Sequence, residues 1–435
     1  MKKIYLVLIL ILFVLSRLWH LLAMPPFLDE LIYVRWLDTI KTTGNWLLPL
    51  KEFGWEPLGI WTASLINRII SDPLLSLRLN SVIFSALSLV MVYKLAGRSA
   101  AFFYVFSPII LFHDRLGLRG DNLVILATLM VLYGLKKRLE AKKPNAVIWV
   151  GLGIALGLFT KTTAAALPIV VVLSYLWFRP KLKLIDYISG ILSTIPFLFY
   201  WLTGTLGQVI NKESTFVGEA LLKNNLLQIG PWLFQYLTWP VLLLIIGGLI
   251  LSWKNRLLLI SWLVPLFLLA VSAKILFPRY LLPIIPFLLI YAASGFNWIK
   301  QKLPKSLRPL LIVFLLLPAW FSWQMILNPK TAALPEIDKW QYVTGWPSGY
   351  GLAELITYLK TDPPALLVTE DNDLIKSGLP YLWPDHPFVI TQTATASAYF
   401  VSNINNQLPD GLTGRLIKEF PRPENKSALR LWQLE

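Results

Sequence analysis

Long apolar stretches recur along most of the chain, and they restrict it to folds that hide such stretches from water. They number about eleven, and a helix of roughly 20 apolar residues is long enough to cross a bilayer. They lie at 4–23, 74–94, 98–112, 122–135, 146–160, 163–178, 184–203, 232–252, 256–273, 279–298 and 309–327. Of the 435 residues, 56% are apolar and 15% charged, less charge than a water-soluble domain carries. We therefore predict an all-α polytopic membrane bundle.

The cations indicate the orientation of this bundle. If Lys2 and Lys3 are cytoplasmic, every second loop is cytoplasmic too, and those loops are the basic ones. They hold Lys94 and Arg98; Lys136, Lys137, Arg138, Lys142 and Lys143; Arg179, Lys181 and Lys183; Lys254 and Arg256; and Lys300, Lys302, Lys305 and Arg308. The formal charge of +16 is thus a topology signal and an attraction to lipid surfaces, with no soluble basic face for a nucleic acid. We expect a multi-pass plasma-membrane protein, its N-terminus cytoplasmic and its C-terminus outside.

Two further features limit the chemistry. The first apolar segment has no clear small-x-small cleavage site near Ala23, so an uncleaved helix is favoured over a signal peptide. The chain has no cysteine and only three scattered histidines, which argues against disulfides, thiol catalysis and a His-based metal site. We expect no required cofactor; a divalent metal is compatible with the chemistry below, but no ligand spacing supports one.

The most informative polar feature is the pair Asp29-Glu30, close behind the first apolar segment. Carboxylates at a membrane boundary are costly to desolvate and are seldom kept there without a role. The pair opens a long predicted outer loop, 24–73, in which apolar residues at helical spacing indicate amphipathic surface helices. An interfacial anchor is the plain alternative for this loop, but it leaves the paired acids unexplained.

The other predicted outer loops also carry charges. The loop 113–122 combines two cations and two anions, for which a mutually neutralising cluster is the alternative interpretation. Lys161 stands alone between two apolar segments, against the positive-inside trend, which favours an anionic partner. Arg279 and Tyr280 begin a proline-broken helix, where snorkelling is the alternative role of the cation.

Acids from two loops and cations from three suit one reaction class. A carboxylate can take the proton of an acceptor hydroxyl, while Lys and Arg can neutralise a departing phosphate. This combination indicates transfer of a sugar from a polyprenyl-phosphate donor.

The chain also resembles the C-type (GT-C) superfamily of integral membrane glycosyltransferases, in the branch of protein O-mannosyltransferases and the lipid A aminoarabinose transferase. The resemblance covers roughly residues 1–330, and the order and spacing of its short motifs carry it. The motifs are Pro26-Phe27-Leu28-Asp29-Glu30; Glu56-Pro57-Leu58-Gly59-Ile60-Trp61; Ser107-Pro108, Asp114-Arg115 and Asp121-Asn122-Leu123; the glycine-rich 151–161, ending in Thr160-Lys161; and Arg279-Tyr280-Leu281-Leu282-Pro283.

The resemblance implies Asp29 as the catalytic base, Glu30 beside it and Asp121 as a second acid. It places Lys161 and Arg279 near the lipid phosphate. The substrate-binding candidates are Glu56, His113, Arg115, Arg119, Lys161, Arg279 and Tyr280. One departure is that Trp55-Glu56 stands where the aminoarabinose branch has a lysine, which leaves Lys161, Arg115 or Arg119 to substitute. Another is Gly345-Trp346-Pro347 in place of the Trp-Trp-Asp motif of oligosaccharyltransferases, which disfavours en bloc transfer to asparagine.

The composition changes after residue 329, where the apolar runs stop and acids rise. We predict a transmembrane domain, 1–329, followed by a small extracytoplasmic α/β domain, 330–435. The latter would contain a helix over 350–360 and strands at 365–368, 387–390, 398–401 and 429–432. The acidic turn 370–373 after the first strand is interpreted as solvated rather than as a metal or sugar site.

These observations predict an inverting glycosyltransferase that moves a sugar from a polyprenyl-phosphate donor, undecaprenyl or dolichyl, to a hydroxyl acceptor on the outer face. A flippase of lipid-linked sugars is the alternative. It would call for charges near the bilayer midplane and an internal repeat, neither of which is evident. A non-catalytic membrane scaffold is a third interpretation, and it too leaves the acidic pair unexplained.

Overall fold

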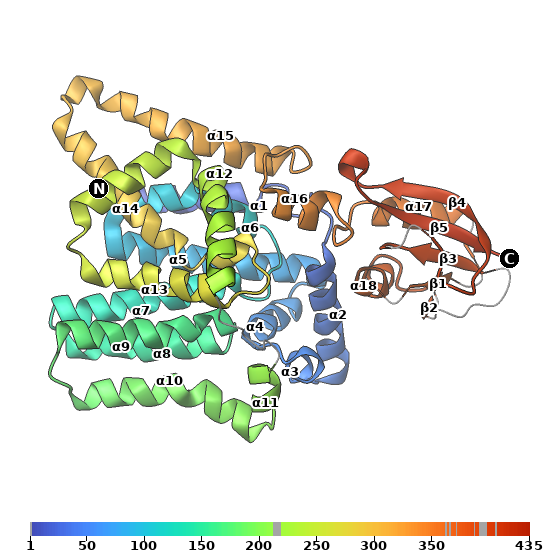
Figure 1. Ribbon diagram of the computed structural model, residues 1–435, viewed down its shortest axis with the longest axis horizontal. Helices are drawn as coiled ribbons and strands as arrows, with labels where there is room; N and C mark the ends of the chain where they lie inside the picture. The colour runs from blue at the N-terminus through green and yellow to red at the C-terminus, as the bar shows by residue number, and fades with distance from the viewer. Residues whose placement is uncertain are drawn as a thin grey trace.

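The computed structural model describes residues 2–435 apart from 212–218, 362, 365–366, 371, 387, 391–397 and 405–406. A bundle of helices is joined to a small sheet domain, with the N-terminus at the end of the bundle away from the sheet (Figure 1). The principal helices of the bundle are α1 (Lys2–Leu18), α5 (Pro73–Val105), α6 (Pro108–Asp114), α7 (Asp121–Leu135), α8 (Ile148–Leu158), α9 (Ala166–Phe178), α10 (Leu184–Leu202), α12 (Glu219–Ser252), α13 (Arg256–Ser272), α14 (Ile285–Lys302) and α15 (Val313–Leu327).

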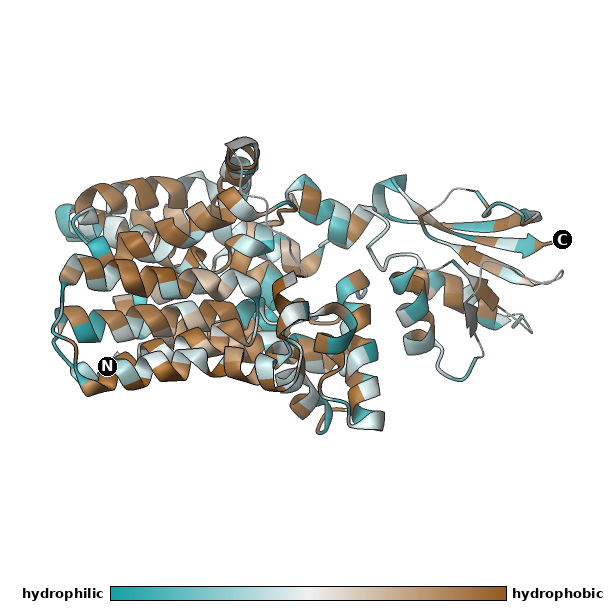
Figure 2. Ribbon diagram, turned by 60° about the horizontal axis from the view of Figure 1, so that its bottom comes forward, coloured by the Kyte–Doolittle hydropathy of each residue, from teal (hydrophilic) through white to brown (hydrophobic). Residues whose placement is uncertain are grey.

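Four helical segments are long and apolar enough to cross a membrane by length and composition: 73–105, 184–202, 221–252 and 305–327. Five shorter apolar helices accompany them among the described residues. Apolar residues dominate the bundle (Figure 2), and α10 turns large apolar side chains outward, with Ile191 67% exposed. This is the pattern of helices that face lipid. A mostly helical bundle with a small sheet domain is therefore confirmed, while the number of eleven spans stays a prediction.

Local backbone chemistry explains where the observed helices differ from the predicted stretches. Gly97 has φ 79° and ψ −162°, so α5 is two helical pieces joined at a kink rather than one straight rod. The predicted stretch 98–112 is divided again before Pro108, which begins α6. The stretch expected to start at 279 begins as the 3₁₀ turn η4 (Pro278–Leu281), and α14 starts only at Ile285, because prolines interrupt regular hydrogen bonding.

The long loop after α1 folds into three helices at one end of the bundle, which we call the loop end. These are α2 (Leu28–Thr43), α3 (Leu48–Phe53) and α4 (Leu58–Asn67). Both α2 and α3 end at a glycine in the left-handed conformation, Gly44 and Gly54, which is how many helices stop. The sheet domain lies at the same end, beyond α2 (Figure 1).

The sheet domain follows a connecting segment that contains α16 (Glu336–Lys339) and the π-helical turn η6 (Trp340–Thr344). Its sheet has the order β2-β1-β3-β5-β4, with parallel pairs on both sides of β1 and antiparallel pairs on both sides of β5. The strands are β1 (Leu367–Thr369), β2 (Phe388–Ile390), β3 (Tyr399–Ser402), β4 (Gly414–Pro421) and β5 (Ala428–Leu434), with helices α17 (Leu352–Thr361) and α18 (Asp373–Leu382).

The predicted helix 350–360 and the four predicted strands correspond to α17, β1, β2, β3 and β5, apart from residues 365, 366 and 387, which lie outside the described residues. Strand β4 and helix α18 were not predicted. Much of β4 is exposed, and its burial does not alternate regularly, so the period-two signal is weak.

Helix α2 contacts both parts of the protein. Leu31 belongs to the apolar core of the sheet domain, where it packs with α17 and α18 residues. The start of α2 is also bound to the segment that connects the bundle to the sheet domain, because the Leu28 amide donates to the Pro347 carbonyl at 2.8 Å. A Cβ on Gly349 would lie 2.0 Å from the Pro26 carbonyl oxygen, so only glycine allows this close approach. The start of α2 is thus fixed between the bundle and the sheet domain.

Candidate active site

The structure separates the two acids of the Asp29-Glu30 pair. Glu30 is fully buried, and Arg78 of α5 donates to both of its oxygens at 2.8 Å. The Gly117 amide donates to the same carboxylate at 2.6 Å. These bonds satisfy a charge that would otherwise be costly to bury. Glu30 therefore ties α2 to the bundle and offers no free oxygen for proton transfer.

Asp29 instead points toward the cation predicted to bind phosphate. Nη2 of Arg279, on η4, donates to Oδ2 of Asp29 at 2.9 Å. The Asp29 side chain keeps 17% of its surface exposed, in contrast to the buried Glu30. Of the two neighbouring acids, Asp29 is thus the one that a substrate can reach.

A second acid and cation pair stands beside the first. Asp121 is the first residue of α7, where a negative charge is favoured by the helix dipole. Nζ of Lys161, in extended backbone just before the turn η3 (Thr162–Ala165), donates to Oδ1 of Asp121 at 2.6 Å. The same ammonium lies 4.6 Å from the centre of the Tyr280 ring, a cation–π contact with the residue next to Arg279.

Tyr33 shows that the two pairs share one site. It lies one helical turn after Asp29 on α2, so both side chains share a helix face. Burial raises the pKa of the Tyr33 phenol, and the carboxylates of Asp29 and Asp121 raise it further, while Arg119 and Arg279 oppose them. The phenol therefore lies within electrostatic reach of both acids. The sequence alone did not single out Tyr33 as a site residue.

Glu56, just before α4, and Arg119, in the loop before α7, form one edge of the site. Oε1 of Glu56 accepts from the Thr162 hydroxyl at 2.9 Å, and its Oε2 lies 3.6 Å from Nη1 of Arg119. The Arg119 guanidinium lies 4.5 Å from the ring centre of Trp55. Glu56 therefore joins η3 to the loop that precedes Asp121.

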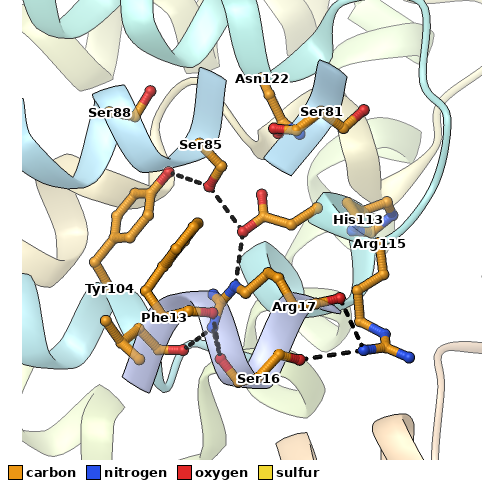
Figure 3. Close-up of polar contacts among 12 residues, drawn as sticks. Phe13, Ser16, Arg17, Ser81, Ser85, Ser88, Tyr104, His113, Arg115 and Asn122 are labelled. Carbon is orange, nitrogen blue, oxygen red and sulfur yellow. Dashed lines mark hydrogen bonds and ion pairs between the residues drawn. The ribbon is translucent and has the colours of Figure 1, made fainter. Parts of the chain in front are cut away.

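Arg115, a predicted substrate ligand, is bound to the end of α1. Its guanidinium donates to the carbonyls of Ser16, Trp19 and His20, at 3.1, 2.6 and 2.8 Å. Beside it, buried Asp114 accepts from Arg17 at 3.1 Å, and Figure 3 shows this network within the bundle. The structure thus gives Arg115 and Asp114 partners inside the protein.

His113 lies deeper, beside three residues that the sequence did not single out: Tyr236, Asp338 and Tyr342. Its Nε2 is 3.6 Å from Oδ2 of Asp338, on α16, and that same oxygen accepts a hydrogen bond from the Tyr236 hydroxyl. The rings of His113 and Tyr342 are 6.2 Å apart. No motif marks Asp338 or Tyr342, because both come from the connecting segment after the last apolar run.

Among the described residues, no group of three or more His, Cys, Asp or Glu side chains is arranged to hold a metal ion. At the loop end, two carboxylates instead each pair with one cation, Asp29 with Arg279 and Asp121 with Lys161. Such an arrangement can accept a proton and neutralise an oxyanion in the same small space.

Comparison with known proteins agrees with this interpretation. Residues 56–216 match the family described as dolichyl-phosphate-mannose-protein mannosyltransferase. No curated protein matches the chain. Two solved structures of ArnT from Cupriavidus metallidurans share its fold over 99% of this chain and 97% of theirs. The apo form has a TM-score of 0.62 at 15% identity, and the form bound to undecaprenyl phosphate has 0.63 at 14%.

The resemblance to GT-C membrane glycosyltransferases of the O-mannosyltransferase and aminoarabinose-transferase branch is therefore confirmed. The same matches support a protein that resides in a membrane, as its long apolar helices also indicate.

Proposed function

We propose that this chain, which has the ArnT fold, is an inverting glycosyltransferase. It would move one sugar from a polyprenyl-phosphate donor to a hydroxyl acceptor on the outer face of the membrane. The observation that carries this proposal is the pairing of Asp29 with Arg279 beside that of Asp121 with Lys161.

In the proposed reaction the acceptor hydroxyl attacks the anomeric carbon of the donor sugar. Asp29 takes the hydroxyl proton as the new glycosidic C–O bond forms. The bond between the anomeric carbon and the phosphate oxygen breaks on the opposite face, and its electron pair leaves with the polyprenyl phosphate. A single displacement of this kind inverts the anomeric configuration.

Arg279 and Lys161 would stabilise the departing phosphate. Each cation aimed at charge that develops in the transition state contributes on the order of 3–4 kcal/mol in a water-poor site. Arg279 is 8% exposed and Lys161 holds a 14% exposed side chain, so both are shielded from bulk water. The proposed reaction uses no metal.

The Asp29–Arg279 contact couples donor binding to the base. The phosphodiester of the donor carries one negative charge, as a carboxylate does, and gains a second as it leaves, so it competes with Asp29 for the same guanidinium. When the phosphate takes over that contact, Asp29 loses its neutralising partner and becomes a stronger base. We assign to Asp121 the role of holding Lys161 in position.

A solved structure of the same fold suggests the kind of lipid carrier. One of the ArnT structures is bound to undecaprenyl phosphate. Its phosphate is the group that Arg279 and Lys161 would take here, and its chain would lie along the apolar bundle. The length of the carrier in this protein is left open between undecaprenyl and dolichyl.

In the direct experiment, the purified protein is given either a radiolabelled polyprenyl-phosphate sugar or a radiolabelled nucleoside diphosphate sugar, together with candidate hydroxyl acceptors. We expect transfer from the polyprenyl donor alone, with inversion seen by NMR of the product. Transfer from the nucleotide sugar would contradict the assignment of the donor. Movement of the lipid-linked sugar across the bilayer without transfer would establish a flippase instead.

A further inference from the structure

Four buried polar atoms behind the Asp29–Arg279 pair have no hydrogen-bond partner within the described part of the chain. They are Nε2 of His113, Oδ1 of Asp338, the hydroxyl of Tyr342 and Nε of Arg279. All four residues are at least nine-tenths buried. Because nearly all buried polar groups in proteins are hydrogen-bonded, four such atoms in one neighbourhood call for an explanation.

Contacts and electrostatics place these atoms together. Tyr342 lies between Phe27 and Phe112, with ring centres 4.8 and 5.4 Å away. Burial raises the pKa of its phenol well above the usual value, Arg279 opposes this, and the carboxylates of Asp338 and Asp29 add to it. Tyr342 therefore lies within electrostatic reach of both the base and the deeper acid. His113 stands beside Asp338, 3.6 Å from its carboxylate.

The four atoms differ in what they can donate or accept. Nδ1 of His113 lies 2.8 Å from the Ile109 carbonyl, and only a protonated nitrogen can bond there, so Nε2 is an acceptor. Nε of Arg279 is a donor, and the Tyr342 hydroxyl can do both. Asp338 can also do both when protonated, and burial raises its pKa to about 7. A phosphate offers mainly acceptors and leaves such a set half unsatisfied, whereas sugar hydroxyls both donate and accept.

We propose that His113, Asp338, Tyr342 and Nε of Arg279 bind the ring hydroxyls of an uncharged hexose on the polyprenyl-phosphate donor. This inference rests on the proposed function and deepens it, because it assigns the sugar-specificity residues of the same site. The sugar would lie on the inner side of Arg279, with its phosphate on the Asp29 side. Binding would give each unpartnered atom a hydroxyl.

Equilibrium binding of two probes tests this assignment in the full-length protein: polyprenyl phosphate alone, and polyprenyl phosphate carrying mannose or glucose. Tyr342→Phe and His113→Phe each remove one proposed hydroxyl contact, since phenylalanine can neither donate nor accept. We expect each to weaken binding of the sugar-bearing probe by about tenfold, the scale of one lost hydrogen bond to a buried polar group. Binding of polyprenyl phosphate alone should change by less than about twofold.

Tyr291→Phe is the matched control, since it removes the hydroxyl of another buried tyrosine, on α14. It should leave both affinities unchanged, and thermal unfolding should show that all three variants are folded. Equal loss for both probes, or no loss for either, would overturn the sugar assignment and leave internal water as the partner of these atoms. Failure of the wild-type protein to bind polyprenyl phosphate at all would instead refute the proposed function.

Discussion

Asp29 and Arg279 are 250 residues apart in the chain, yet Nη2 of Arg279 donates to Oδ2 of Asp29 at 2.9 Å. This contact joins the start of the first loop helix to the beginning of a late helix of the bundle. In the proposed reaction it brings the group that takes a proton next to the group that receives the leaving phosphate. The sharing of Arg279 between carboxylate and phosphate has consequences that can be measured.

Replacing Arg279 should impair chemistry more than folding. Arg279→Gln removes one cation from the developing phosphate charge, so we expect kcat to fall by roughly 10²–10³. Arg279→Lys should recover only part of this, because an ammonium cannot copy the planar guanidinium. Steady-state kinetics with saturating donor would measure both. Lys274→Gln, an exposed cation of the same loop, is the control and should retain full activity.

Glu30 should matter for stability rather than proton transfer. Glu30→Gln leaves the fully buried Arg78 without its counter-charge, which costs about 3–5 kcal/mol in comparable buried pairs. We expect a clear drop in Tm by thermal unfolding in detergent. Glu336→Gln, which breaks an exposed pair with Lys426, should change stability by less than about 1 kcal/mol. A Tm for Glu30→Gln equal to that of Glu336→Gln would show that the buried pair is not structural.

Asp338 should make stability depend on pH. Burial raises its pKa in the folded protein to about 7, against an ordinary value of 3.8, while Tyr236 and Arg279 limit the rise. Between these values the folded protein holds a proton that the unfolded chain has lost, so the free energy of unfolding falls as pH increases from about 4 to 7. Asp338→Asn should flatten the slope of Tm across this window. Asp410→Asn, exposed in the sheet domain, should leave it unchanged.

The contact of α4 with the loop before α7 should tolerate no added side chain. A Cβ on Gly59 would lie 1.4 Å from the Arg119 carbonyl oxygen, so Gly59→Ala must displace the backbone that leads to Asp121. We expect activity to fall by at least about tenfold, since small misplacements at a reacting centre are costly. Gly190→Ala on α10 meets no atom within 4 Å and serves as the control. Equal transfer rates for the two variants would argue against a tight fit at Gly59.

The helical bundle and the small α/β domain could be predicted because their signals are local. Apolar stretches of membrane length and the short apolar runs of β3 and β5 are visible in the sequence itself. The stretches predicted at 74–94 and 98–112 already separate where Gly97, with φ 79°, kinks α5, but the break within α12 was not predicted. It lies at Thr238, with φ 61°, two residues before Pro240. The conformation of Thr238 depends on packing that no local pattern reports.

The candidate site, too, could be predicted from the sequence only in part. Motif order drew attention to Asp29, Asp121, Lys161 and Arg279, and the structure brings them together as two ion pairs. The resemblance also favoured Asp29 over Glu30 as the base, but the sequence could not show the ion pair that holds Glu30, because Arg78 is 48 positions away. Tyr342 and Asp338 reach the site only through the path of the connecting segment after α15. Their roles, like those of the motif residues, stay predictions.

The central claim is that Asp29 is the base for transfer from a lipid-linked donor. Its most direct test is the initial rate of transfer from polyprenyl-phosphate [¹⁴C]hexose by purified protein in liposomes, for wild type, Asp29→Asn and Asp38→Asn. Asp38 is the matched control, an exposed acid on the same helix. We predict that Asp29→Asn lowers the rate by roughly 10²–10⁴, the usual contribution of a general base, while Asp38→Asn retains it. An Asp29→Asn rate within about twofold of the wild-type rate would contradict the account.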